Sequence, residues 1–179
     1  MFSIQCLLVT PDEQNLFIDV LGNKNVAGTS LDIYTKSGCQ YNQLWNLVPS
    51  GTKNYYFIQS LLVTEAGENL VIDVQGGKNA AGTPLDLYTK KTPDAPNQLW
   101  EIVVPQTPDS ASDLWYIQSK LVSAKGERLV IDIVGGKINT PGTHLCVNPN
   151  LGIYSQQLWY LASVGDVGSS FPPHVSFPG

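Results

Sequence analysis

A single pattern of residues occurs three times along the chain, and this repetition constrains the fold more than any other feature of the sequence. Each copy has an apolar segment containing an Asp, then a Gly-Thr pair, and it ends in Gln-Leu-Trp. The apolar segments are Phe17–Val20, Val71–Val74 and Val130–Ile133, and the Gln-Leu-Trp segments are Gln43–Trp45, Gln98–Trp100 and Gln157–Trp159. Because the order recurs, we divide the chain into units of about residues 1–53, 54–111 and 112–165, followed by a C-terminal tail at 166–179.

Within each unit, short β-branched and aromatic runs are separated by Gly, Pro, Asn and Asp, which indicates strands and turns rather than helices. In the second unit this pattern predicts strands near 56–63, 69–74, 84–89 and 98–104. Closing three such four-stranded units about one axis buries a shared core. We therefore predict an all-β fold, a β-trefoil of three pseudo-symmetric four-stranded repeats. A three-bladed propeller is the alternative, but propellers typically have four or more blades.

The size and charge of the chain narrow its possible functions. With 179 residues and a net charge of -5, it suits one domain and lacks the basic surface that nucleic-acid binding requires. No apolar stretch is long enough to cross a membrane, and the first residues lack the charged and apolar regions of a signal peptide. We expect a protein that is cytoplasmic or exported without a cleaved signal, with no nucleic-acid partner and no membrane insertion.

The three cysteines, Cys6, Cys39 and Cys146, form neither an even set nor a CxxC or His-linked motif. Such a set predicts neither a disulfide framework nor a zinc site. We therefore take the thiols as reduced, and we expect no metal and no cofactor.

The three Gln-Leu-Trp segments resemble the Gln-x-Trp signature of the ricin-B-type (R-type) β-trefoil lectins, and the resemblance covers all three units. In that family, sugars are bound by an Asp after the apolar pair of the second strand, by a polar and an aromatic residue on the third strand, and by an Asn just before Gln-x-Trp. The resemblance implies carbohydrate-binding residues Asp19, Asp32, Tyr34 and Asn42 in the first unit and Asp73, Asp86, Tyr88 and Asn97 in the second. The third unit has Asp132, Cys146, Asn148 and Gln156 at these positions, so without an aromatic ring we expect a weaker site there or none.

These residue types suit a sugar for chemical reasons. A carboxylate such as Asp19 or Asp73 accepts hydrogen bonds from two adjacent hydroxyls, and an Asn both donates and accepts. A Tyr ring offers a flat apolar face to the C–H groups of the sugar. We expect a lectin for galactose or N-acetylgalactosamine glycans, in which weak sites gain avidity by acting together. The repeated Trp residues are assigned to the core.

Three other functions are compatible with the pattern. The Asp pairs could be the two carboxylates of a glycosidase, but the same pair occurs twice whereas catalysis requires one asymmetric cleft, so we expect no enzyme activity. They could hold calcium, although no dense Asp-x-Asp loop is present. A β-trefoil can also be a protease inhibitor or another protein-binding module, whose activity would lie in one long loop such as residues 104–112. A homodimer is compatible with any of these functions.

Overall fold

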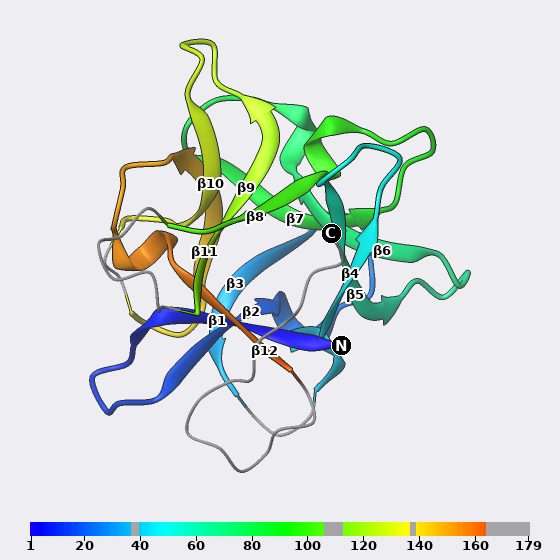
Figure 1. Cartoon of the computed structure of the whole chain (residues 1–179). Helices are drawn as coiled ribbons and strands as arrows, with labels where there is room; N and C mark the ends of the chain where they lie inside the picture. The colour runs from blue at the N-terminus through cyan, green and yellow to red at the C-terminus, as the bar shows by residue number, and fades with distance from the viewer. Residues whose placement is uncertain (37–39, 106–112, 137–138, 164–179) are drawn as a thin grey trace.

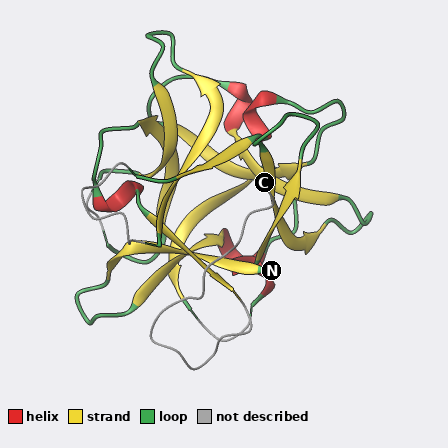
Figure 2. Cartoon of the chain, in the orientation of Figure 1, coloured by secondary structure: helices red, strands yellow, loops and turns green. Residues whose placement is uncertain are grey.

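The structure is a computed structural model, and it describes residues 1–36, 40–105, 113–136 and 139–163. The expected tail at 166–179 lies outside the described residues, as do Cys39 and most of the loop at 104–112. Within the described part, twelve antiparallel strands form one continuous sheet, and the helical segments are single short turns at its margins (Figure 2). The prediction of an all-β fold is confirmed.

The strands are rich in β-branched and other apolar residues, and β2, β6 and β10 each bury five consecutive side chains, including the Asp of the repeated segment. They are β1 (Phe2–Val9), β2 (Asn15–Val20), β3 (Thr29–Thr35), β4 (Trp45–Pro49), β5 (Tyr56–Val63), β6 (Asn69–Val74), β7 (Thr83–Thr89), β8 (Trp100–Val103), β9 (Leu114–Val122), β10 (Arg128–Ile133), β11 (Thr143–Pro149) and β12 (Trp159–Ser163).

Short 3-10 turns connect several of these strands. They are η1 (Leu21–Asn23), η2 (Tyr41–Gln43), η3 (Gln75–Gly77), η4 (Pro96–Gln98) and η5 (Ser155–Gln157). The strand predicted at 98–104 therefore begins only at Trp100, because the residues before it form η4. In η1 and η3, Gly22 and Gly76 have φ angles of 66° and 64°, in the left-handed region that glycine adopts without a steric penalty.

Strand pairing divides the described sheet into a ring and a cap. The ring is closed, because each member pairs with the next in the order β1, β4, β5, β8, β9, β12 and back to β1. The cap consists of the pairs β2–β3, β6–β7 and β10–β11, which meet through contacts among β3, β7 and β11. The same pairing scheme thus occurs in three successive segments, whose hairpins project in different directions (Figure 1).

The core lies between the ring and the cap. Trp45, Trp100 and Trp159 are fully buried there, as expected, together with Ile and Leu side chains from every part of the sheet. Each indole Nε1 donates a hydrogen bond to a strand carbonyl, at 3.1 Å in the case of Trp100 and Ile72. A large aromatic side chain with a satisfied N–H is well suited to such a position.

Two of the thiols are free and buried, at Cys6 and Cys146. Burial raises the pKa of both to about 12, so they remain neutral at physiological pH. None of the helical segments in the described residues is long and apolar enough to cross a membrane.

Candidate functional site

Strand register brings the predicted site residues together in pairs. In the β2–β3 ladder Asp19 lies directly opposite Asp32, and in the β6–β7 ladder Asp73 lies opposite Asp86. Directly opposite residues of an antiparallel pair point to the same face of the sheet, with Cβ atoms about 4.5–5.5 Å apart. Two carboxyl groups therefore face each other in each of these ladders.

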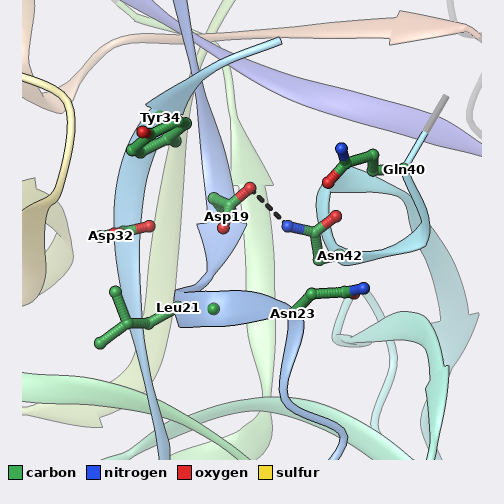
Figure 3. A pocket seen from close by; sticks show the side chains of 8 residues that line it. Asp19, Leu21, Asn23, Asp32, Tyr34, Gln40 and Asn42 are labelled. Carbon is green, nitrogen blue, oxygen red and sulfur yellow. Dashed lines mark hydrogen bonds between the residues drawn. The ribbon is translucent and has the colours of Figure 1, made fainter. Parts of the chain in front are cut away.

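All four residues predicted for the first unit line one cavity of about 260 Å³, which we call the first cup. Figure 3 shows the Asp32 side chain pointing toward Asp19, the Asp19 carboxyl group next to the Asn42 amide, and Tyr34 at the edge. The cup is lined by Asp19, Leu21, Gly22, Asn23, Asp32, Tyr34, Gln40 and Asn42. The Tyr34 side chain is 46% exposed, which leaves its ring accessible to a ligand.

The polar atoms of the first cup are only partly satisfied by the chain itself. Asn42 Nδ2 donates a hydrogen bond of 2.8 Å to Asp19 Oδ2. Within the described residues, the buried Oδ1 atoms of Asp32 and Asn42 accept no hydrogen bond. A buried acceptor without a donor is unfavourable by about 1–3 kcal/mol. The cup therefore offers acceptor atoms that a ligand can satisfy.

Burial also changes the titration of the two carboxyl groups in this cup. It raises the pKa of Asp19 to about 6, against the lowering effect of hydrogen bonds from Gln43 and Asn42. It raises the pKa of Asp32 to about 7, and the negative charge of Asp19 contributes to that increase. The pair thus loses its protons close to neutral pH.

The equivalent residues of the second unit, Asp73, Asp86, Tyr88 and Asn97, form what we call the second cup. Its first carboxylate, Asp73, accepts several internal hydrogen bonds, whereas the buried Oδ1 of Asp86 accepts none within the described residues. Asn97 Nδ2 donates to Asp73 Oδ1 at 2.7 Å, as its counterpart does in the first cup. Gln98 Nε2 donates to Asp73 Oδ2 at 2.8 Å and to the Thr89 carbonyl at 2.9 Å. The Gln of Gln-x-Trp is therefore structural, and it also orients the carboxylate.

Lys91 adds a cation to the second cup. Its Nζ lies 3.2 Å from Asp73 Oδ2 and 5.2 Å from the centre of the Tyr88 ring. Burial and the charge of Asp73 raise the pKa of Asp86 to about 7, and the positive charge of Lys91 opposes that increase. The ammonium group thus lies close to two of the groups that the family resemblance assigns to sugar binding.

In the third unit, the carboxylate is occupied by its own chain. Asp132 Oδ1 accepts from the Ile133 backbone N–H at 2.7 Å, and Oδ2 accepts from Asn148 Nδ2 at 3.0 Å and Gln157 Nε2 at 2.8 Å. Cys146 lies opposite Asp132 in the β10–β11 ladder, and Gln156 is buried nearby in η5. This arrangement stabilises the turn and leaves little for a ligand to bind.

The sequence matches the family model described as "Ricin-type beta-trefoil lectin domain-like", over residues 8–88 and again over 42–148. The chain belongs to this family. No curated protein sequence matches it. Membership makes the described sheet a β-trefoil and the chain a lectin-type, carbohydrate-binding protein, and it confirms the resemblance to the ricin-B-type lectins.

Solved structures agree on the fold. The designed threefold-symmetric protein ThreeFoil superposes with a TM-score of 0.69 at 18% identity, covering 91% of this chain and 98% of its own. The C-half of an earthworm R-type lectin, solved with GalNAc, has a TM-score of 0.57 at 16% identity, covering 89% and 97%. An exo-β-1,3-galactanase from Clostridium thermocellum has a TM-score of 0.68 at 20% identity over 89% of this chain, but the match spans only 29% of that enzyme.

Some residues of the two cups were not found from the sequence. Lys91 contacts Asp73, and Gln40 lines the first cup. The sequence indicated that the turn containing Asn23 borders the first cup and that Gln98 is structural, and Gln98 also contacts Asp73. A Gln next to each repeated Asn was visible as a pattern, whereas Lys91 has no repeated counterpart that would have singled it out. In the part of the chain that the structure describes, no three His, Cys, Asp or Glu side chains lie close enough together to hold a metal ion.

Proposed function

We propose that this chain binds galactose- or N-acetylgalactosamine-type glycans through the first and second cups. The observation that carries the proposal is that Asp19, Asp32, Tyr34 and Asn42 meet in one cavity and leave buried acceptor atoms without a donor. Sugar hydroxyls are donors that can satisfy such atoms, while the exposed face of Tyr34 packs against ring C–H groups. The cavity volume of about 260 Å³ suits one monosaccharide ring rather than a long segment of chain.

The three units are proposed to differ in affinity. A sugar can enter the first cup without breaking an ion pair among the described residues, whereas in the second cup it must displace Lys91 from Asp73. In the third unit Asp132 already accepts three hydrogen bonds. We therefore expect the first cup to bind most strongly and the third unit not to bind.

We further propose that the chain has no glycosidase activity. Paired carboxylates cleave a glycosidic bond from opposite sides, one as acid and one as base or nucleophile. Asp19 and Asp32 instead lie side by side on neighbouring strands of one sheet. Both would contact the same side of a ligand, which suits recognition rather than cleavage. The proposed architecture is one domain over residues 1–165, built of three pseudo-symmetric four-stranded repeats.

Calorimetric titration with galactose and N-acetylgalactosamine tests the function. A hydrogen bond to a charged group contributes about 1.5–3 kcal/mol, so Asp19→Asn should weaken binding in the first cup by about 10- to 100-fold. Asp73→Asn should abolish the weaker second site. Asp12→Asn is the control, because Asp12 lies in the exposed β1–β2 turn, away from both cups, where it bonds to Thr10 and Gln14. Undiminished binding by the Asp19→Asn, Asp73→Asn double variant contradicts the proposal.

A further inference from the structure

The two cups form a matched pair that differs in one charge. Both have opposed carboxyl groups, a Tyr at the edge and an Asn that donates to the first carboxylate. Only the second cup contains an ammonium group among the described residues, that of Lys91. The second cup therefore shows that an ammonium group can approach both the Asp73 carboxylate and the Tyr88 ring.

Cations near the first cup are engaged elsewhere or lie outside it. Lys36 Nζ lies over the Phe17 ring, 5.4 Å from its centre. His144 is opposite Asp32 in the β3–β11 ladder, but it is exposed and does not line the cavity. Within the described residues, neither Asp19 nor Asp32 forms an ion pair. The Lys24 side chain lies against Gly22, which lines the cup, but Lys24 itself does not line the cavity. Among the described residues, the lining of the first cup thus has two carboxyl groups and no cation.

We propose that the first cup selects amino sugars whose amine is not acetylated, and that the protonated amine binds between Asp19, Asp32 and the ring of Tyr34. This inference rests on the proposed sugar binding and names its substrate class. The ammonium group would take the position that Lys91 Nζ takes in the second cup, where it lies 3.2 Å from a carboxylate oxygen and 5.2 Å from a Tyr ring centre.

The contacts explain why an ammonium group is preferred to a neutral amide. Its N–H groups would donate charge-assisted hydrogen bonds to Asp19, and the negative charge of Asp32 would add an electrostatic attraction rather than a hydrogen bond, because Asp86 Oδ1 accepts no hydrogen bond from Lys91 in the second cup. The exposed face of Tyr34 adds a cation–π contact. Binding would also drive the Asp32 carboxyl group to release its proton, since a nearby positive charge favours the ionised form.

A bare metal ion fits the first cup less well. Calcium takes six to eight oxygen ligands, and magnesium requires near-octahedral geometry. The cup offers two carboxylates, and Asn42 directs its amide nitrogen, a donor, toward Asp19. A cavity of about 260 Å³ is also far larger than a single ion needs.

The test is calorimetric titration of the chain at about pH 6.5, below the ordinary pKa of such amines, with galactosamine, N-acetylgalactosamine and calcium chloride as separate ligands. Galactosamine should bind one site per chain at least about tenfold more tightly than N-acetylgalactosamine, as expected for one additional charge-assisted hydrogen bond. Asp32→Asn should remove this preference.

Lys91→Ala provides an independent variant, because it should open a second galactosamine site between Asp73, Asp86 and Tyr88. The matched control is Lys90→Ala, which removes the adjacent lysine. That lysine lies over the Phe57 ring at 4.4 Å, so the number of sites should remain one.

Three results overturn the inference: equal or weaker binding of galactosamine, a preference unaffected by Asp32→Asn, or a single site in Lys91→Ala. If calcium chloride gives a heat of binding that depends on Asp32 and galactosamine gives none, the first cup binds a metal ion instead. If N-acetylgalactosamine still binds in an Asp19-dependent way, only this inference fails. If neither sugar binds, the proposed function fails with it.

Discussion

Replacing Asp32 with Asn should make the protein more stable at neutral and alkaline pH, although it alters a binding residue. Asp32 is 1% exposed, and burial together with the charge of Asp19 raises its pKa from 3.8 to about 7. Because the folded-state pKa lies above the unfolded one, this carboxyl group contributes stability that is fully present below the unfolded pKa. That contribution is lost as the pH rises through about 7. An Asn side chain keeps the shape and can donate toward Asp19 without ionising.

The magnitude follows from the size of the shift. A shift of about three pKa units corresponds to about 4 kcal/mol at the upper limit, and water in the open cup should reduce this to about 2 kcal/mol. For a chain of this length, about 2 kcal/mol corresponds to an increase in Tm of about 4–8 °C. Asp32→Asn should therefore melt higher than the wild type at about pH 8, and the two should converge near pH 4, where the wild-type carboxyl group is protonated.

Thermal melts followed by tryptophan fluorescence between about pH 4 and 8 measure the effect. Asp12→Asn is a control of opposite sign, because the hydrogen bond from Thr10 lowers the pKa of Asp12 and its contribution is lost as the pH falls. The reasoning is refuted if Asp32→Asn is no more stable than the wild type at about pH 8, or if the difference between them does not change with pH.

Three further predictions concern other parts of the fold. Trp100→Ala, which removes a fully buried indole and its bond to a strand carbonyl, should lower the free energy of unfolding by about 3–5 kcal/mol in urea denaturation. Asp132→Ala should lower the free energy of unfolding by about 2–4 kcal/mol in the same assay, because a buried backbone N–H and two amide groups lose their acceptor. This substitution should not change sugar affinity. Lys91→Ala should raise the pKa of Asp86 above about 7, since the lysine's charge lowers it, and an NMR titration of the carboxyl carbon would show the shift.

The sequence predicted the parts of the structure that depend on repetition. The repeated Trp residues are fully buried as expected. The resemblance to the R-type lectins implied that Asp19, Asp32, Tyr34 and Asn42 form one site, and these four residues line one cavity. Period and order are enough for the buried Trp residues, because equivalent residues in equivalent strand pairs take equivalent positions, whereas the site residues were implied by the family resemblance. Membership of the lectin family confirms the interpretation at the level of the fold.

Features that depend on strand register or on one unit alone could not be predicted. The facing of Asp19 and Asp32 requires knowledge of which residues pair across the β2–β3 ladder, and spacing along the chain does not give it. Lys91 lies in a connection that is one residue longer in the second unit than in the first, so alignment of the copies does not point to it. β8 begins at Trp100 rather than at residue 98 because a 3-10 turn precedes it. The residues of that turn have strand-like neighbours, so the sequence pattern did not separate the turn from the strand.

A crystal of the chain soaked with galactosamine or N-acetylgalactosamine tests most directly whether the cups bind sugars. We predict a monosaccharide in the first cup, with its ring against Tyr34 and polar groups hydrogen-bonded to Asp19 and Asp32. The account is contradicted if neither the first nor the second cup contains sugar and if Asp19 and Asp73 are hydrogen-bonded only to side chains and backbone of their own chain.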